Sequence, residues 1–338
     1  MRPMNVSAEW KWTDHVGRIL CRISGFRMRY SVQPGLYAVG SPGSGSDVFV
    51  SANYKLSFDI LRAALKGLDA WVLVLDTKGI NVWCAAGKGT FGTDELIRRI
   101  SEAALERVVS HTRVIVPQLG APGVSASAVQ RATGFRVHYG PVEARDIREY
   151  LAAGRNATQR MRRVRFGLFD RLVLIPMELF PAIKIYPLYS LLILVVMALG
   201  LPLQAASLRG AATEAVPLLV MGIAAIAAGA IAVPLLLPVL PFRSFALKGW
   251  LAGIVAAFFT ATGMGIGYSN DALLFIMAML FFPAASSYIA LQFTGATTFT
   301  GPSGVRKELR YAMPVYAVAG VISLALLVVF KLERLGIL

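Results

Sequence analysis

Thiols and imidazoles are scarce in this sequence, and charged residues are fewer than usual. The 338 residues include only two cysteines, Cys21 and Cys84, and three histidines. Two cysteines cannot build a disulfide framework, and the histidines lack the spacing of a zinc site. Charged residues make up 16% and hydrophobic residues 56%, against about 25% and 45–50% in ordinary soluble domains. This composition argues against a purely soluble, disordered or fibrous protein.

The charges are concentrated in the first half of the chain. Residues 1–171 hold 25 Lys/Arg and 14 Asp/Glu, whereas residues 172–338 hold 9 and 5. A bilayer-crossing helix needs about 20 predominantly apolar residues. Five uncharged stretches in the second half qualify, at 186–204, 215–240, 249–269, 272–294 and 312–330. We therefore expect three parts: a charged domain over 1–165, a basic juxtamembrane or interfacial linker over 166–185, and a transmembrane domain of five helices over 186–338.

The placement of Lys and Arg predicts which side of the membrane the first domain occupies. Six arginines precede the apolar half against a single acid, Asp170, namely Arg155, Arg160, Arg162, Arg163, Arg165 and Arg171. Basic residues gather on the cytoplasmic side of membrane proteins. Residues 1–12 contain no apolar run typical of a secretory signal. We expect a multi-pass protein of the cytoplasmic (inner) membrane with its N-terminal domain in the cytoplasm, and we expect the arginines to contact anionic lipid, not nucleic acid.

The first half alternates between strand and helix patterns. Short apolar runs at 47–52, 71–75, 114–116 and 135–139 predict strands. Helices are predicted between and after them: 57–68 capped by Ser57, a helix capped by Thr93 with an apolar face reaching Val108, 124–133 and 143–152. Residues 28–46 resemble a hairpin. The alternation predicts an α/β, Rossmann-like fold with a doubly wound parallel sheet, whose ligands bind at the carboxyl ends of the strands. Those ends are the small or polar segments 51–53, 76–79, 118–123 and 140–142.

One segment, residues 79–93, does not look like scaffold. Asn81 is suited to cap a short helix that Gly87 ends, which places Cys84 over the strand ends. The glycine spacing does not fit a Walker A loop, and a dinucleotide fingerprint at Gly87, Gly89 and Gly92 does not directly follow a strand. A cysteine protease lacks a placed histidine. On chemistry alone, Cys84 can equally be a small buried hydrophobe.

The residues around Cys84 resemble a known family. The run Asn81-Val82-Trp83-Cys84-Ala85-Ala86-Gly87-Lys88 is similar to the signature of the membrane corrinoid protein of bacterial and archaeal mercury methylation. The flanking runs 51–59 and 89–93 resemble it as well, as does the expected architecture. The first domain is also similar to the corrinoid-binding domain of the corrinoid iron–sulfur protein of acetyl-CoA synthesis, a relative without a membrane half.

The resemblance implies a cobalamin site. Cys84 would ligate cobalt from below, and its neighbours on the short helix would shape a cap over the corrinoid. A His-ligand motif of the form Asp-x-His-x-x-Gly is absent from the sequence, because Asp14 and His15 are adjacent. The strand ends would take the displaced tail of the cofactor. The candidate cofactor-binding residues are Ser51, Asn53, Thr77, Asn81, Val82, Trp83, Cys84, Ala85, Ala86, Gly87, Lys88, Thr90, Leu119, Gly120, Gly140, Pro141 and Val142.

The resemblance also implies an activity and partners. The family transfers a methyl group from a Cys-ligated methylcobalamin to Hg(II), which makes the chain a candidate mercury methyltransferase. A ferredoxin-like iron–sulfur protein is the implied reductant and possible Hg(II) donor, and a folate-linked system is the implied methyl source. Two other functions stay open: a membrane-anchored corrinoid methyl carrier for one-carbon metabolism, and a transport or sensor protein with a corrinoid regulatory domain.

Overall fold

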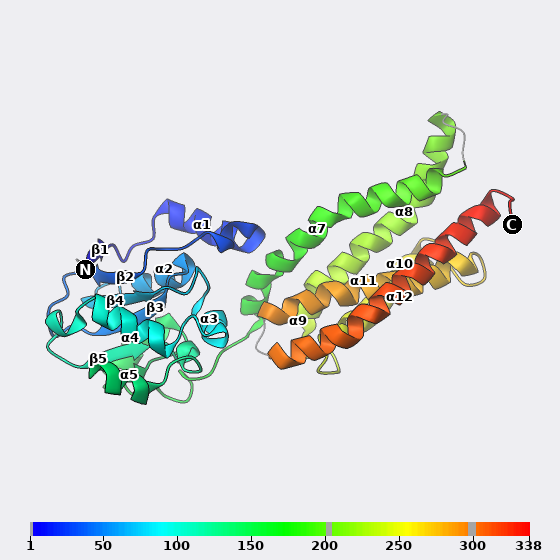
Figure 1. Cartoon of the computed structure of the whole chain (residues 1–338). Helices are drawn as coiled ribbons and strands as arrows, with labels where there is room; N and C mark the ends of the chain where they lie inside the picture. The colour runs from blue at the N-terminus through cyan, green and yellow to red at the C-terminus, as the bar shows by residue number, and fades with distance from the viewer. Residues whose placement is uncertain (1–2, 201–204, 297–301) are drawn as a thin grey trace. The chain divides into compact units, whose positions relative to one another are not determined.

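The computed structural model describes residues 3–200, 205–296 and 302–338. The chain forms two compact units, residues 1–165 and 166–338 (Figure 1). Each unit has its own hydrophobic clusters and is described by itself.

A six-stranded sheet forms the centre of the first unit. Its order is β1-β2-β4-β3-β5-β6, with β1 at Met4–Val6, β2 at Gly35–Val39, β3 at Val48–Ala52, β4 at Ala70–Leu75, β5 at Arg113–Val116 and β6 at Arg136–Tyr139. The last four strands run parallel, as the sequence predicts. The hairpin expected over 28–46 is wrong, because β2 pairs antiparallel with β4 and parallel with β1.

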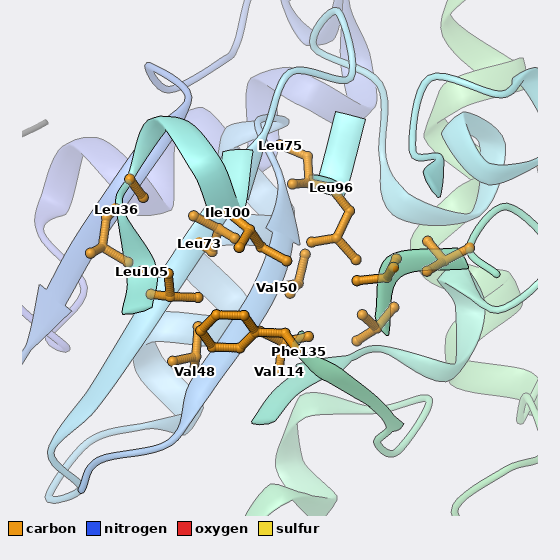
Figure 2. Packing of buried hydrophobic residues seen from close by; sticks show 14 of the residues in the cluster. Leu36, Val48, Val50, Leu73, Leu75, Leu96, Ile100, Leu105, Val114 and Phe135 are labelled. Carbon is orange, nitrogen blue, oxygen red and sulfur yellow. The ribbon is translucent and has the colours of Figure 1, made fainter. Parts of the chain in front are cut away.

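Both faces of the sheet are covered, because successive side chains of its strands enter different hydrophobic clusters. Val48, Val50 and Ala52 of β3 pack with residues of α4 and α5, and Figure 2 shows much of this cluster. Phe49 lies between them in sequence and packs on the other face with α2 and α6. Sheets covered on both faces have strands that read as continuous apolar runs, and every residue of β3 and β4 is buried.

The strand order places a switch point beside β3. The chain moves from β3 to β4 on one side and then returns to add β5 on the other side of β3. The winding direction therefore reverses between β3 and β5. In open α/β sheets, such a reversal leaves a crevice outside the carboxyl ends of the two strands.

The connecting helices are shorter than the sequence indicates, and several begin at other residues. The observed segments are α1 Trp12–Ile23, η1 Gly25–Met28, α2 Lys55–Ala64, α3 Val82–Lys88, α4 Thr93–Glu102, η2 Leu105–Arg107, η3 Gln118–Gly120, α5 Ala126–Thr133, η4 Ala144–Asp146 and α6 Ile147–Ala152. Tyr54, not Ser57, is the N-cap of α2. Gly92, not Thr93, caps α4, because the Thr93 hydroxyl accepts a hydrogen bond from the Ser125 N–H instead.

A buried ionic cluster fastens the N-terminal segment to α2. Asp14 of α1 lies 2.5 Å from Lys55 Nζ and 2.6 Å from Arg62 Nη2. Asp59 contacts the same two cations at 2.6 and 2.8 Å. Arg62 also donates to the carbonyl oxygens of Ser7 and Glu9. Two acids and two bases thus satisfy one another, which a buried charge requires.

The second unit consists of long apolar helices. Its helical segments, which include three short ones, are α7 Leu168–Ala198, α8 Ala205–Ala227, η5 Ala228–Ala232, α9 Val233–Leu236, α10 Phe245–Gly263, α11 Ala272–Gln292, η6 Phe293–Ala296 and α12 Pro302–Arg334. Within the described residues, five helical segments are long and apolar enough to cross a membrane, at 168–198, 209–236, 245–263, 272–292 and 304–334. The linker expected over 166–185 is not separate from the first expected span, because from Leu168 onward both belong to one helix, α7. The expected span 186–204 reaches past residue 200, and its last four residues lie outside the described ranges.

Small residues let these helices approach closely. A Cβ on Gly249 or Gly253 of α10 would lie 2.5 Å from Ser287 Cα or 2.7 Å from Pro283 Cα, both in α11. Apolar helices in a membrane gain little from the hydrophobic effect when they associate, because lipid is as apolar as their side chains. They associate instead through close packing, which glycine permits. Gly249 and Gly253 therefore serve packing between α10 and α11.

Acid should loosen the attachment of α1. Burial by itself raises the pKa of the Asp14 carboxyl. Hydrogen bonds from the Lys55 side chain and the Lys11 N–H, together with the positive charges of Lys55 and Arg62, outweigh this effect and lower the pKa to about 2. Because the pKa of Asp14 is lower in the folded chain than its value near 4 in the unfolded chain, the ionised carboxylate stabilises the fold at every pH above 4. This contribution to the free energy of unfolding, about 2 kcal/mol, is lost as pH falls from 4 to 2. Asp14→Asn should remove it at neutral pH, which hydrogen exchange in α1 and α2 would detect.

The matched control is Glu9→Gln. Glu9 pairs with Lys66 at 3.0 Å, but both side chains are exposed, so the pair contributes little. Equal loss of protection in both variants would show that the buried cluster does not hold α1.

Candidate functional site

A cavity of about 310 Å³ opens at the switch point of the sheet. Its floor is formed by the ends of β3 and β5, and its walls by α2, the start of α3 and the segments that follow β5 and β6. The lining residues are Phe49, Val50, Ser51, Ser57, Ile60, Leu61, Asn81, Val82, Trp83, Ile115, Pro117, Leu119, Gly140, Pro141, Val142, Ala144 and Ile147. The wall is largely apolar, with Ser51, Ser57 and Asn81 as its polar side chains, which suits a flat apolar ligand with few hydrogen-bonding groups.

Eight of the residues predicted from the sequence meet around this cavity. They are Ser51, Asn81, Val82, Trp83, Leu119, Gly140, Pro141 and Val142. They come from four segments far apart in the chain, which the sheet brings to one edge. The remaining predicted residues do not line the cavity, and the structure gives each of them another place.

Asn53 and Thr77 face the protein itself. Asn53 Oδ1 accepts hydrogen bonds from the N–H groups of Thr77 and Gly79, at 3.1 and 2.9 Å. The Thr77 hydroxyl lies 2.8 Å from the same oxygen and 2.6 Å from the Ile80 carbonyl oxygen. Both side chains are buried. They therefore fix the turn after β4 and do not line the cavity, and their contact with a cofactor stays a prediction.

This turn needs such support because its backbone is unusual. Lys78 and Gly79 have φ angles of +59° and +71°, and the left-handed region is unfavourable for a lysine. Asp76 holds the turn from the other side, since its carboxylate accepts from the Lys78 N–H at 3.1 Å and from Lys78 Nζ at 2.8 Å. The hydrogen bond from Lys78 lowers the pKa of the Asp76 carboxyl against the opposing effect of burial. The carboxylate therefore stays ionised at neutral pH.

The turn leads directly into α3. Asn81 is the N-cap, as the sequence predicts, and its Oδ1 accepts from the Cys84 N–H at 2.9 Å. The helix ends at Lys88 with Gly89 at φ +80° as its C-cap, so the glycine that ends it is Gly89 and not the predicted Gly87. Gly89 supplies the left-handed conformation that glycine adopts without strain.

The two faces of α3 have different neighbours. Val82, Ala85 and Ala86 are buried in the core cluster of the sheet. Trp83, Gly87 and Lys88 are exposed, and Cys84 is half-buried as a free thiol. The outer face therefore presents an indole, a thiol and an ammonium group. The alanines expected to shape a cap over the cofactor instead support the helix from below.

The inner face of α3 requires small residues. A Cβ on Gly123 would lie 2.1 Å from the Phe91 carbonyl oxygen and 3.2 Å from Ala86 Cα, so the backbones are in contact here. A Cβ on Gly120 would lie 2.4 Å from Phe91 Cε1. Gly120 thus accommodates the buried Phe91 ring, which explains its presence without a ligand. Thr90 is half-buried, and its N–H donates to the Ala85 carbonyl oxygen at 3.0 Å.

Sequence reasoning missed the contribution of α2 to the cavity. Ser57, Ile60 and Leu61 line it, whereas Ser57 was interpreted as a helix cap. Ile60 carried a usable signal, because it lies off the apolar face formed by Phe58, Leu61 and Leu65, and its side chain is 46% exposed. A large apolar residue outside the core face of a helix suggests a binding surface.

The site has one thiol and no metal-binding cluster of its own. Within residues 3–200, 205–296 and 302–338, no group of three or more His, Cys, Asp or Glu could hold a metal ion. The whole sequence has two cysteines, which are too few for an iron–sulfur cluster with four thiolate ligands.

Residues 25–151 match the family model of the CO dehydrogenase/acetyl-CoA synthase delta subunit. This segment holds α2, α3 and every lining residue of the cavity. The match covers less than half of the chain, so the similarity concerns the first unit.

Curated relatives agree with the family model. The acetyl-CoA decarbonylase/synthase complex subunit gamma of Archaeoglobus fulgidus is 31% identical over 127 residues, which are 37% of this chain and 27% of the relative. The corresponding subunit of Methanopyrus kandleri is 30% identical over 150 residues, 44% and 32% of the two chains. That of Methanothermobacter thermautotrophicus is 32% identical over 127 residues, 37% and 27%. The chain thus spans about three tenths of the length of these relatives.

These comparisons correct the assignment to mercury methylation. The family model and the relatives name subunits of acetyl-CoA synthesis and decarbonylation, so the prediction of a mercury methyltransferase is wrong. The other similarity noted in the sequence, to the corrinoid iron–sulfur protein of acetyl-CoA synthesis, agrees with them. The first unit of this chain is similar to subunits of the acetyl-CoA decarbonylase/synthase complex.

Proposed function

We propose that this chain is a membrane-anchored corrinoid protein that carries methyl groups in one-carbon metabolism. The observation that carries the proposal is the cavity at the switch point, next to the helix that bears Cys84. The whole arrangement lies within the segment similar to acetyl-CoA synthase subunits. The role is that of a carrier, with donor and acceptor enzymes as separate partners.

The cavity fits a part of a corrinoid. At about 310 Å³ it is too small for a corrin ring with its side chains, but large enough for one aromatic base. Its apolar walls suit the two faces of such a base, and Ser51, Ser57 and Asn81 can reach polar atoms at its edge. The residues that line the cavity would hold the base of the cofactor's tail, and Trp83 and Cys84 of α3 would hold the ring.

Cys84 is the side chain offered to cobalt. It is half-buried on the outer face of α3, and Asn81 holds the N–H of the same residue. When bound, a corrinoid supplies a cobalt centre that accepts and releases a methyl group. A thiolate suits a soft metal centre. Trp83 would lie against the ring, while Asn53 and Thr77 keep α3 at its height above the strand ends.

A corrinoid carrier needs electrons to return accidentally oxidised cobalt to its active state, and the two cysteines of this sequence are too few for a cluster with four thiolate ligands. We infer an iron–sulfur protein as the partner. A folate-linked methyl donor has no support in the comparisons and is left out of the proposal.

The second unit is the proposed membrane anchor. Its five long apolar segments are sufficient in length and composition, and the arginines before them favour a cytoplasmic first unit. Two buried cations, Arg171 and Lys248, donate to the carbonyl oxygens of Leu235 and Leu237 at the end of α9, each at 2.5 Å. They satisfy carbonyl groups that a broken helix leaves without partners.

Topology gives the first test. Five crossings place the two ends of the chain on opposite sides, so a reporter fused after Leu338 should be active only on the periplasmic side of the membrane. The same reporter fused before the first unit should be active only inside. Cytoplasmic activity at both ends would overturn the five-span anchor.

Replacement of Cys84 tests the cobalt ligand. Cys84→Ala should leave the chain folded and able to hold cobalamin through the cavity, but with a changed visible spectrum and little methyl transfer from a methyl donor. Cys84→His should restore ligation without the full rate, because imidazole donates less strongly than thiolate. Cys21→Ala is the control, since this thiol lies on the buried face of α1; the change costs about 1–2 kcal/mol of stability. An unchanged spectrum in Cys84→Ala would remove Cys84 from the site.

Filling the cavity tests the place of the tail. Ala144→Phe should put a ring into the wall and weaken cobalamin binding at least tenfold, or about 1.4 kcal/mol. Ala132→Phe on the exposed side of α5 is the matched control and should bind normally. Equilibrium dialysis of the full chain in detergent would measure both. Unchanged binding in Ala144→Phe would show that the tail does not use the cavity.

A further inference from the structure

Helix α1 presents its large apolar residues to the outside of the first unit. The residues that it buries are Asp14, Gly17 and Cys21. Trp12 and Ile19 lie on the opposite side, 79% and 58% exposed, and their spacing of seven places them on one face of a helix. In most surface helices the apolar stripe faces the core, so this orientation is reversed.

The contact beneath α1 explains why the reversal holds. A Cβ on Gly17 would lie 2.2 Å from the Tyr30 hydroxyl oxygen, so only glycine permits this close approach. Asp14 is held by Lys55 and Arg62 in the buried ionic cluster. The inner face is therefore fixed by sterics and by charge, and α1 cannot roll to bury Trp12 without losing these contacts.

Cations flank the exposed apolar stripe. Lys11, Arg18 and Arg22 are spaced by seven and four residues and share one side of the helix. Residues 11–29 contain five Lys/Arg and one acid, Asp14, whose carboxylate is buried and paired. The nearest preceding acid, Glu9, pairs with Lys66. The outer face of α1 is thus apolar and positively charged, with no exposed acid of its own.

Exposed large hydrophobic residues in the described part of the first unit are few, and this helix region holds half of them. They are Trp12, Ile19, Met28, Ile60, Trp83 and Val164. Ile60 and Trp83 line the cavity, and Val164 lies in the segment that leads to α7. Trp12, Ile19 and Met28, in α1 and η1, remain without a role in the corrinoid site.

We propose that the outer face of α1 docks on the surface of a bilayer rich in anionic phospholipid. An indole and aliphatic side chains suit the interfacial region, while lysine and arginine pair with phosphate headgroups. The proposal rests on the proposed membrane anchor, which would keep the first unit near the bilayer. Lipid is favoured over an acidic protein because Trp12 and Ile19 form an exposed apolar stripe along a single helix and the cations lie beside it.

Photo-crosslinking identifies what covers Trp12. The full chain carrying Trp12→p-benzoylphenylalanine is placed in nanodiscs of phosphatidylcholine alone or of phosphatidylcholine with phosphatidylglycerol, and illuminated. We expect phospholipid adducts by mass spectrometry, roughly fivefold more abundant with phosphatidylglycerol and reduced by high salt, because the attraction is electrostatic. Adducts mainly to α7–α12, to a second copy or to a partner protein would overturn the proposal.

Charge reversal tests the electrostatic part. Arg18→Glu in the crosslinking chain should abolish the preference for phosphatidylglycerol, whereas Arg131→Glu, on the exposed side of α5, should retain it. Hydrogen exchange in α1 verifies that the helix stays folded in both. Incorporation of the chain into nanodiscs and its corrinoid spectrum are read separately, so failure of the anchor or of the carrier role is distinguishable from failure of docking. A preference retained in Arg18→Glu would contradict the proposal.

Discussion

One side-chain oxygen, Asn53 Oδ1, holds together the part of the fold on which the site depends. It lies at the end of β3 and receives the N–H groups of Thr77 and Gly79, with the Thr77 hydroxyl at 2.8 Å. These contacts fix two consecutive left-handed residues, Lys78 and Gly79. Without them the chain would leave β4 in another direction, and α3 would not begin beside the cavity. The sheet thus positions Cys84 through the buried side-chain amide of Asn53.

The two faces of the short helix α3 have different roles: the inner face packs on the sheet and the outer face carries the proposed cobalt ligand. Its inner residues, Val82, Ala85 and Ala86, pack against the sheet and against a backbone that only glycine permits at Gly123. Its outer residues, Trp83, Cys84 and Lys88, are at least partly accessible. The packed inner residues hold the helix rigidly and so fix the position of the Cys84 thiol. A metal ligand needs such support, because its geometry depends on the residues packed around it.

The sequence predicts the sheet better than it predicts the roles of individual polar residues. Apolar runs such as 71–75 place the parallel strands, since a strand covered on both faces cannot be polar, and the N-cap role of Asn81 follows from its chemistry. The alternation does not reveal which way a polar residue after a strand will point. Asn53 and Thr77 turned inward, while Ser51 faces the cavity. Helix ends differ from the predicted residues where a tertiary hydrogen bond takes the side chain that would cap the helix, as the Ser125 N–H does with the Thr93 hydroxyl.

Short runs indicate the reaction of a domain less well than its whole length does. The motif around Cys84 and its flanking runs 51–59 and 89–93 cover only part of the domain, whereas the similarity to acetyl-CoA synthase subunits extends over residues 25–151. A short motif reports local geometry that different reactions can share. The cavity and the strand order belong to the domain, and they support a corrinoid carrier without specifying what receives the methyl group.

The most direct test of the account is X-ray absorption at the cobalt edge of the full chain loaded with cobalamin. We expect a sulfur atom in the first coordination shell of cobalt, lost in Cys84→Ala and retained in Cys21→Ala. A first shell of nitrogen and oxygen alone in the unmodified chain would contradict the assignment of Cys84 and, with it, the proposed placement of the corrinoid over α3.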